Sequence, residues 1–262
     1  MRKLGETKMQ YDLQNKVAVI SGGTSGIGLA AAKLFLANGA KVVIAGRQPE
    51  KGQAVLQMCP QFAPNLQFVR ANICVPAECA NLVAQTAACY GKIDILVNSA
   101  GIYREKPIAA MTETEYADIM DTNVKGTYFM CKYVLPELRR AEGGSIVNIA
   151  SDAGLRGNFQ CMAYCASKGA VIAMTRALAL EVAGDGIRAN CVCPGDVATP
   201  MLENQIAAAD NLISLADMEK WYPLGRVAQP AEIAHVIAFL AAGVSSFVTG
   251  AVWSVDGGIT AC

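Results

Sequence analysis

The sequence predicts an α/β protein that folds as a single domain around a doubly wound parallel sheet. Short runs rich in Val and Ile alternate with helical stretches along the whole chain, a pattern typical of βαβ units. Hydrophobic residues make up 53% of the 262 positions and charged residues 17%, so a large core that covers both faces of a sheet is expected. No linker, charge run or repeat divides the chain.

Seven runs have the length and composition of buried strands: Lys16–Ile20, Lys41–Ala45, Leu66–Arg70, Ile93–Val97, Ser145–Ile149, Ile187–Val192 and Ala251–Val255. Helical patterns between them include Ile27–Asn38, Ala77–Cys89, Glu113–Leu138 and Met162–Glu181. This alternation implies right-handed crossovers between parallel strands. We expect residues 1–12 to form an N-terminal extension and residues 13–262 to form the domain.

Charge and cysteine usage exclude several classes of protein. The formal net charge is zero and no basic cluster is present, which argues against nucleic acid as a partner. Residues 1–15 lack the apolar stretch of a secretory signal, and no apolar run approaches the ~18 residues of a membrane span. Ten cysteines are scattered without paired CxxC spacing, and His235 is the only histidine. We therefore expect no metal site, no Ser-His triad, and reduced cysteines in a cytoplasmic protein.

A glycine-rich turn follows the first predicted strand and opens the first predicted helix. In the segment Ser21-Gly-Gly-Thr-Ser-Gly-Ile-Gly28, Gly22 permits a tight turn and Gly26 lets the backbone approach a pyrophosphate. Gly28 allows close packing of the helix on the strand, and the helix N-terminus faces the anion. The turn therefore predicts a dinucleotide site in a Rossmann-like domain.

Further polar or small residues follow three other strands, where ligands of parallel sheets bind. They are Asn98-Ser99-Ala100-Gly101 after the fourth strand, Ser151 after the fifth, and Pro194-Gly195-Asp196-Val197-Ala198-Thr199-Pro200-Met201 after the sixth. Each segment alone could be an ordinary turn, but together they indicate a site along one edge of the sheet.

Tyr164 and Lys168 stand four residues apart within Met162–Glu181, so both side chains lie on one face of that helix. A phenol with a reference pKa of ~10 is a poor acid or base at neutral pH, and a cation within about 4–6 Å lowers that pKa. We therefore expect Lys168 to bring the pKa of Tyr164 toward the range of efficient acid–base catalysis. The same spacing also occurs on solvated helix faces, so the other motifs must decide between the two interpretations.

As a set, the motifs resemble those of the short-chain dehydrogenase/reductase family, of the single-domain type. The resemblance covers Leu13 to Cys262, nearly the whole chain. Ser151 precedes Tyr164 by thirteen residues, and Lys168 follows. The other segments that carry the resemblance are Gly26-Ile27-Gly28, Asn98-Ser99-Ala100-Gly101, Asn123-Val124-Lys125-Gly126, Pro194-Gly195 with Thr199, Pro223-Leu224-Gly225-Arg226 and Val255-Asp256-Gly257-Gly258.

The resemblance implies an oxidoreductase in which Tyr164 exchanges a proton with the substrate oxygen. It implies that Lys168 lowers the pKa of Tyr164 and binds the nicotinamide ribose, that Ser151 hydrogen-bonds the substrate oxygen, and that Asn123 holds a water relay. Two preorganised hydroxyl donors would stabilise the charge that hydride transfer leaves on that oxygen. The implied cofactor contacts are Gly22, Thr24, Ser25, Gly26, Ile27, Gly28, Arg47, Asn72, Ile73, Asn98, Ala100, Gly101, Tyr164, Lys168, Pro194, Gly195, Val197 and Thr199.

Three positions depart from the family pattern. Ser21 replaces a usual Thr and keeps a hydroxyl, and Asn72-Ile73 stands where Asp-Val often contacts adenine. Gly46-Arg47 ends the second strand where an NAD enzyme carries an acidic residue for the ribose hydroxyl. Because a guanidinium pairs well with a phosphate, this favours NADP(H), with NAD(H) as the alternative.

The sequence leaves the substrate open. Residues 201–222 follow the cofactor turn and mix apolar side chains with few charges, so we expect a lid over the reacting centre and a small-molecule substrate with apolar bulk. A hydroxysteroid, an aliphatic ketone, a 3-oxoacyl thioester and a polyol all fit. Expected substrate contacts are Asn158, Gln160, Asp196, Met201 and Trp221, with Tyr103 and Phe159 near them.

Three alternatives to this carbonyl reductase remain. One is an NAD-linked dehydrogenase of polyols or sugar alcohols, another is a dinucleotide-binding sensor without turnover, and the third is a nucleotide-sugar epimerase or dehydratase. We also expect a homotetramer, because the helical stretches Glu113–Leu138 and Met162–Glu181 are rich in small and apolar residues on more than one face.

Overall fold

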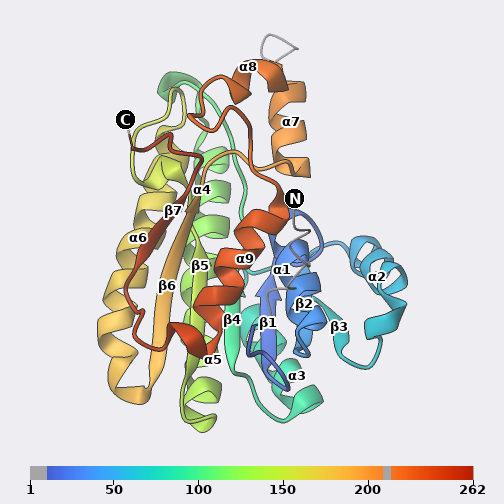
Figure 1. The fold of residues 1–262 in the computed structure, drawn as a ribbon. Coiled ribbons are helices and arrows are strands. Elements are labelled where there is room, and N and C mark those ends of the chain that lie inside the picture. The colour runs from blue at the N-terminus through green and yellow to red at the C-terminus, as the bar shows by residue number, and fades with distance from the viewer. Residues whose placement is uncertain (1–10, 209–213, 262) are drawn as a thin grey trace, which may run out of the picture.

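The computed structural model describes residues 11–208 and 214–261, which form one seven-stranded sheet between two layers of helices (Figure 1). Every pairing between neighbouring strands is parallel. The strand order is β3-β2-β1-β4-β5-β6-β7. The strands are β1 (Val17–Ser21), β2 (Lys41–Gly46), β3 (Leu66–Arg70), β4 (Ile95–Asn98), β5 (Gly144–Ile149), β6 (Ile187–Pro194) and β7 (Val252–Val255). The predicted doubly wound parallel sheet is confirmed.

The helices cover the two faces of the sheet in separate sets. Helices α1 (Gly26–Ala37), α2 (Pro49–Met58) and α9 (Pro230–Ala241) pack on one face. Helices α3 (Pro76–Tyr90), α5 (Thr127–Arg140) and α6 (Met162–Val182) pack on the other. Along β1, Ile20 points into the first core and its neighbour Val19 into the second, as the two-residue period of a strand requires. A strand buried on both faces therefore reads as a continuous apolar run.

The predicted helix Glu113–Leu138 is wrong in one respect, because the structure divides it. Helix α4 (Glu113–Met120) leads into a π-helical turn, Asp121–Gly126, before α5 begins. Asn123 in that turn exchanges two hydrogen bonds with the backbone of Ile102, and a Cβ on Gly126 would lie 2.5 Å from the Ile73 side chain. These long-range contacts favour the wider turn, which is a frequent feature of functional sites.

One residue that precedes the predicted start of the domain also packs in the core. Tyr11, expected in the N-terminal extension, is buried in the same core as Leu13. Its hydroxyl lies 3.0 Å from Nδ1 of His235 on α9, so the only histidine is a helix-packing residue. Residues 1–10 of the predicted extension lie outside the described residues.

The strand ends that carry the predicted motifs meet at one edge of the sheet, at the top of Figure 1. Helices α7 (Pro200–Ala208) and α8 (Leu215–Glu219) lie above this edge, within the segment expected to form the lid. The part of that segment at 209–213 is outside the described residues.

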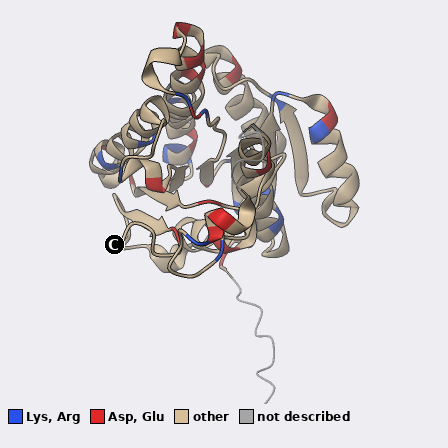
Figure 2. Cartoon of the chain, turned by 90° about the horizontal axis from the view of Figure 1, so that it is seen from above, with Lys and Arg blue, Asp and Glu red and all other residues tan. Residues whose placement is uncertain are grey.

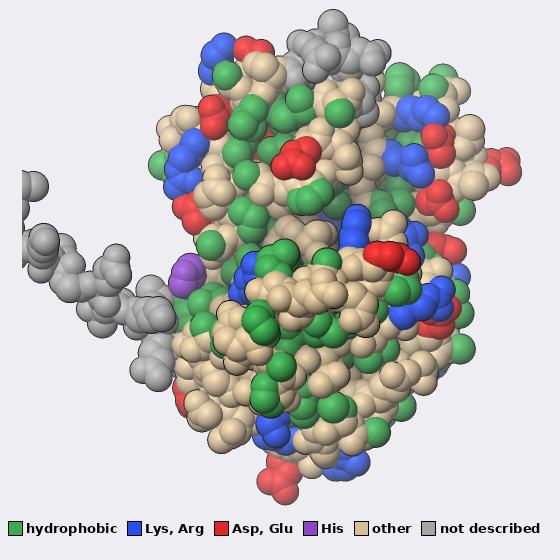
Figure 3. All heavy atoms as spheres, turned by 90° about the vertical axis from the view of Figure 1, so that its right-hand side faces the viewer, with side chains coloured by type: hydrophobic (Ala, Val, Ile, Leu, Met, Phe, Trp, Pro, Cys, Tyr) green, Lys and Arg blue, Asp and Glu red, His purple; other side chains and the backbone are tan. Residues whose placement is uncertain are grey.

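Charged residues of both signs are interspersed along the cartoon seen from above (Figure 2), and their side chains are interspersed on the surface seen from the right-hand side (Figure 3). Within residues 11–208 and 214–261, no helix is long and apolar enough to cross a membrane. The same residues hold no group of three His, Cys, Asp or Glu side chains that could bind a metal ion. The nine cysteines of the described chain are free thiols.

Candidate active site

Two hollows adjoin at the carboxyl edge of the sheet, each of about 340 Å³. The first, here called the Tyr164 cavity, contains Tyr164, Ser151 and Lys168 in its lining. The second, the glycine-turn groove, runs past Gly22 and Gly26 to the end of β2. The residues that line both hollows are Ile27, Ser99, Gly101, Thr199 and Met201. A ligand in the groove can therefore reach a ligand in the cavity.

Backbone geometry at the glycine turn requires glycine, because side chains there would collide with the neighbouring backbone. Gly22 has a φ of 70°, and a Cβ there would lie 2.7 Å from the Ala100 backbone. A Cβ on Gly28 would lie 2.4 Å from the carbonyl oxygen of Gly22, so only glycine lets α1 start this close to β1. The N-terminus of α1 then faces the groove, where its unpaired amide groups attract an anion. The turn fits the pyrophosphate of a dinucleotide.

The far end of the groove is basic. Arg47 lies exposed at the end of β2, and Lys51 on α2 lines the same end. No carboxylate is present among the described residues that line the groove. Lys51 was not predicted, because the sequence pattern did not show α2, the helix that brings Lys51 one turn beyond the strand end.

The two residues of the Tyr-Lys pair are both buried, so their face of α6 is not solvated. Tyr164 is 8% exposed and Lys168 is 5% exposed. The Lys168 Nζ lies 5.7 Å from the centroid of the Tyr164 ring and donates a 3.0 Å hydrogen bond to the Ile149 carbonyl at the end of β5. The pair therefore sits where the sheet edge and the cavity meet.

Burial shifts the pKa values of Tyr164 and Lys168 in the directions that favour their uncharged forms. The pKa of Tyr164 is raised, mainly because burial removes solvent from the phenolate, and a hydrogen bond with Ser151 opposes this only in part. Burial also lowers the pKa of Lys168 to about 8. The expectation that the pKa of Tyr164 lies below that of a free phenol is wrong for this structure, since desolvation dominates and the charges of Asp152 and Asp196 raise the pKa further.

Asn123 is fully engaged with protein groups. Its Oδ1 accepts from the Ile102 amide at 2.9 Å, and its Nδ2 donates to the Ile102 carbonyl and to Ser167 Oγ, each at 3.0 Å. A Cβ on Gly101 would lie 3.3 Å from Asn123 Oδ1 and 3.4 Å from Lys168 Nζ, so both groups flank the same point of the backbone. Asn123 thus ties the segment after β4 to the π-helical turn and to α6.

Ser151 has a charged partner that the sequence did not reveal. Its Oγ donates to Asp152 Oδ1 at 2.8 Å and accepts from the Ala153 amide at 3.2 Å. Arg156 Nη2 holds the other oxygen of Asp152 at 3.3 Å. Both residues lie in the turn after β5 and line the Tyr164 cavity. In the sequence, only the four-residue spacing of Asp152 and Arg156 could have indicated this ion pair.

Most predicted contacts line one of the two hollows. The Tyr164 cavity includes Tyr103, Asn158, Phe159, Pro194, Gly195, Asp196, Val197, Thr199, Met201 and Trp221. The glycine-turn groove includes Gly22, Thr24, Ser25, Gly26, Ile27, Arg47, Asn72, Ile73, Ala100 and Gly101.

Four predicted residues lie outside these linings: Asn123, described above, and Gly28, Asn98 and Gln160. Gly28 and Asn98 support the groove from behind, Asn98 through a buried 2.9 Å hydrogen bond to Asn148. Gln160 has a φ of 55°, and its carbonyl accepts from the Lys106 amide at 2.7 Å. That backbone turn separates Gln160 from Asn158 and Phe159, so the expected substrate contact at Gln160 is not part of the cavity.

Comparison with known proteins agrees with this geometry. A family model described as enoyl-(acyl carrier protein) reductase matches residues 22–260. The chain belongs to the short-chain dehydrogenase/reductase family. Its membership confirms the fold class and the enzyme class that the motifs predicted, an NAD(P)-dependent oxidoreductase.

Individual relatives of this reductase family member differ in their substrates. A 3-oxoacyl-[acyl-carrier-protein] reductase of Chlamydia pneumoniae is 38% identical over 252 residues, 96% of this chain and 100% of the relative. An L-fucose dehydrogenase of Mus musculus is 36% identical over 245 residues, 93% of this chain and 88% of the relative. Among solved structures, ElxO with NADP bound is similar with a TM-score of 0.89 and 31% identity, over 95% of this chain and 100% of that one.

Proposed function

We propose that this oxidoreductase transfers a hydride between NADP(H) and a carbonyl or secondary alcohol, with Tyr164 as general acid and base. The observation that carries the proposal is the position of Tyr164, Ser151 and Lys168 in the cavity that opens onto the glycine-turn groove. A substrate oxygen in the cavity meets two hydroxyls, while a dinucleotide in the groove brings its reactive ring to the shared wall. The nicotinamide supplies or accepts the hydride when it is bound.

The residues of the site supply the proton, the hydrogen bonds to the substrate oxygen and the positioning of the cofactor. The raised pKa of Tyr164 keeps the phenol protonated, so it can give its proton to the oxygen of a carbonyl as negative charge develops there. The Ser151 hydroxyl donates to Asp152 in the structure, and it would turn its one proton to the same substrate oxygen when a carbonyl binds. Lys168 presents an ammonium beside the cofactor ribose, and Asn123 holds the backbone against which the ring lies, in addition to the expected water relay.

NADP(H) is the proposed cofactor because Arg47 and Lys51 place two cations where the adenosine ribose of a dinucleotide in the groove would end. A larger side chain at Gly46 would crowd Thr24 in the groove lining, since a Cβ there would lie 3.1 Å from it. The NADP bound in ElxO supports the proposal, as does the lack of a carboxylate among the described lining residues of the groove. NAD(H) would gain nothing from the two cations.

The test is a titration with NADPH and with NADH, followed by the fluorescence of the reduced nicotinamide, on wild type, Arg47→Ala and Lys51→Ala. We expect each substitution to weaken NADPH binding by about tenfold or more and to leave NADH binding nearly unchanged. Lys33→Ala, an exposed lysine on α1, is the matched control for loss of surface charge. Equal binding of NADH and NADPH by the wild type would contradict the proposed cofactor.

The cavity supports a substrate with apolar bulk. Leu202, Ile206, Met218 and Trp221, from α7 and the segment around α8, form an apolar wall opposite the catalytic hydroxyls. The relatives act on acyl thioesters and on a sugar by their names, so an NAD-linked oxidation of a polyol is the second candidate. Absorbance of reduced nicotinamide with panels of ketones and alcohols separates these candidates from a sensor, which would bind cofactor without turnover, and from an epimerase, which would convert substrate without net reduction.

We also propose that the protein is a cytoplasmic homotetramer. Apolar side chains are exposed on the outer helices, including Tyr116 on α4, Tyr128 on α5, and Met162 and Leu180 on α6. A second exposed set contains Phe247 and, on β7, Trp253. Two such faces can serve two different two-fold contacts. Light scattering at micromolar concentration tests this, and a monomer would contradict it.

A further inference from the structure

Three carboxylates stand among the polar side chains that line the Tyr164 cavity. Asp152 and Asp196 lie in its interior, and Glu105 lies at its rim. The opposite wall is apolar, as described above. The cavity is therefore amphipathic, and its polar side is suited to a ligand group that donates hydrogen bonds.

Asp196 is the carboxylate with the most capacity for a ligand. It follows β6, on the loop that also carries Thr199. Burial is the main reason that the pKa of Asp196 is raised, and the negative charge of Asp152 raises it further. A hydrogen bond from Tyr222 to the Asp196 side chain and the positive charge of Arg156 oppose this shift. A carboxylate offers about four acceptor positions, so a single phenol leaves most of them for a ligand.

The cations near these carboxylates are already engaged. Arg156, the one arginine among the described residues that line the cavity, binds Asp152 at 3.3 Å and the Ile259 carbonyl at 3.4 Å. Lys168 donates to the Ile149 carbonyl, and its pKa is lowered to about 8. An anionic substrate group would have to compete for these cations, and it would be repelled by the carboxylates.

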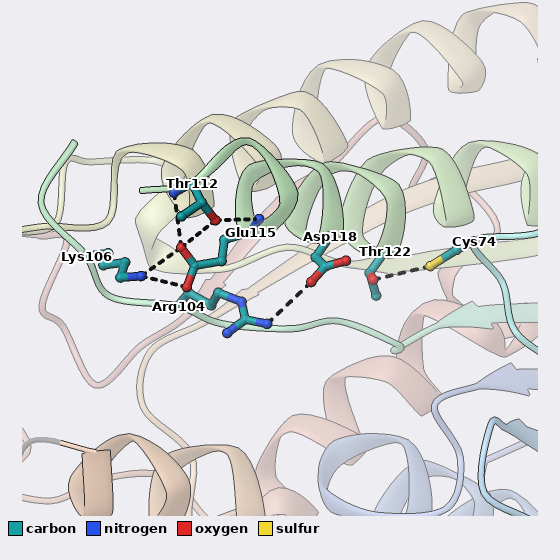
Figure 4. Close-up of polar contacts among 7 residues, drawn as sticks. All are labelled: Cys74, Arg104, Lys106, Thr112, Glu115, Asp118 and Thr122. Atoms are coloured by element: carbon teal, nitrogen blue, oxygen red, sulfur yellow. Dashed lines mark hydrogen bonds and ion pairs between the residues drawn. The ribbon is translucent and has the colours of Figure 1, made fainter. Parts of the chain in front are cut away.

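The third carboxylate, Glu105, lies at the rim of the cavity, while the basic residues on either side of it form ion pairs with helix α4. Tyr103 donates a 2.9 Å hydrogen bond to Glu105, and its ring packs edge-on against Tyr164 with centroids 4.9 Å apart. Arg104 and Lys106, on either side of Glu105, pair instead with Asp118 and Glu115 of α4, at 3.4 Å and 2.7 Å (Figure 4). The segment thus presents a negative charge to the cavity and its positive charges to the helix.

We propose that the physiological substrate is an amino ketone or amino alcohol, whose protonated amine binds Asp196 while its hydrocarbon frame lies against the lid. This inference rests on the proposed hydride transfer at Tyr164. An ammonium group donates up to three hydrogen bonds and relieves the mutual repulsion of the cavity carboxylates. The geometry also predicts discrimination against substrates that carry a carboxylate or a phosphate close to the carbonyl, because the described lining holds three carboxylates against two cations, Arg156 and Lys168, that already contact protein acceptors.

The test uses three cyclohexanones that carry, on the carbon opposite the carbonyl, a dimethylammonium, an isopropyl or a carboxylate group. The first two have nearly the same shape and differ in charge. With NADPH and the wild-type protein at neutral pH, we expect the ammonium compound to show a kcat/KM about tenfold or more above that of the isopropyl compound. The difference should lie in KM, because the ammonium contact is the same in the ground state and the transition state. The carboxylate compound should be the poorest of the three.

Asp196→Asn keeps the shape of the side chain and removes its charge. We expect the ratio of kcat/KM between the ammonium and isopropyl compounds to fall about tenfold in this variant. Glu203→Gln is the matched control, since Glu203 is an exposed carboxylate of α7 outside the cavity lining, and it should keep the wild-type ratio. An unchanged ratio in Asp196→Asn, or equal values for the two compounds in the wild type, would overturn the inference and leave the proposed hydride transfer intact.

A binding measurement separates failure of the inference from failure of the proposed function. Trp221 lines the cavity, and the only other tryptophan, Trp253, lies in β7 and can be replaced by phenylalanine. Reduced alcohols of the three compounds should change Trp221 fluorescence with the same order of affinity, ammonium first. If that order appears and no ketone is reduced, the proposed function fails while the amine site stands. Tighter binding of the carboxylate compound would refute the amine site.

Discussion

Replacement of Lys168 by methionine should make the folded protein more stable at neutral pH while it disables the site. Lys168 is buried, and its pKa falls from 10.5 to about 8. At about 1.4 kcal/mol for each pKa unit, keeping this side chain charged in the folded protein costs about 3 kcal/mol at pH 7. Methionine fills a similar volume without a charge and removes this cost.

One contribution opposes the gain. The Lys168 Nζ donates to the Ile149 carbonyl at 3.0 Å, and its loss leaves a buried acceptor without that partner. An unsatisfied buried group of this kind costs about 1–3 kcal/mol. We therefore expect Lys168→Met to raise the free energy of unfolding by about 1 kcal/mol at pH 7, as other substitutions that relieve strain in active sites do.

The pH dependence gives the sharper test, because it isolates the charge. Below pH 8 the lysine is protonated in both the folded and the unfolded chain, so the full cost is present. Between pH 8 and 10.5 the folded protein has released a proton that the unfolded chain still binds, so the stability of the wild type rises with pH. Near pH 10 most of the cost is gone, and the variant should be the less stable protein because only the lost hydrogen bond remains.

Urea unfolding followed by circular dichroism at pH 7 and pH 10, at one fixed protein concentration, measures this change. The difference in unfolding free energy between the variant and the wild type should shift by about 2–3 kcal/mol between the two pH values. Lys33→Met, an exposed lysine of α1, should show no such shift. The same difference at both pH values for Lys168→Met would refute the argument from burial.

Three further substitutions test the catalytic group, the glycine turn and the buried amide behind it. Tyr164→Phe should lower kcat by about 10²–10⁴-fold and leave NADPH affinity within about threefold, measured by steady-state kinetics and titration; a comparable loss of affinity would contradict a role confined to proton transfer. Gly28→Ala places a Cβ 2.4 Å from a carbonyl oxygen of the glycine turn and should weaken NADPH binding by at least about tenfold, whereas Gly184→Ala, with no atom within 4 Å of the added Cβ, should not. Asn148→Ala removes the acceptor of a buried 2.9 Å hydrogen bond from Asn98 and should lower the free energy of unfolding by about 1–3 kcal/mol in urea, an effect that vanishes if water replaces the amide.

The order of elements could be predicted because each strand carries its own signal. The run Val17–Ser21 is apolar on both faces, and the glycine turn that follows it needs no distant contact to be recognised. The π-helical turn could not be predicted in the same way. It depends on Asn123 reaching the backbone of Ile102 and on Gly126 fitting against Ile73, and neither contact is visible in a helical pattern.

The proposed catalytic pair, Tyr164 and Lys168, was predictable from its spacing, but the pKa shifts of the two side chains were not. The four-residue spacing of Tyr164 and Lys168 predicts that a cation lies near the phenol. The free-energy cost of burying each charge depends instead on how the edge of the sheet packs around the two side chains. Likewise, Asp152 and Glu105 were not predicted as site residues. Asp152 is positioned by a hydrogen bond from Ser151, and Glu105 by one from Tyr103, and the sequence shows neither contact.

Burial raises the pKa of Tyr164 and lowers that of Lys168, because it favours the neutral form of both groups. A neutral Tyr164 holds the proton that a carbonyl oxygen needs, so the free protein is prepared for reduction. Oxidation of an alcohol requires the phenolate, which the carboxylates of Asp152 and Asp196 also disfavour. A positive charge brought into the cavity by the substrate would counter those carboxylates and lower the pKa of Tyr164. An amino alcohol would therefore help to form the base that its own oxidation requires, and a neutral or acidic alcohol would not.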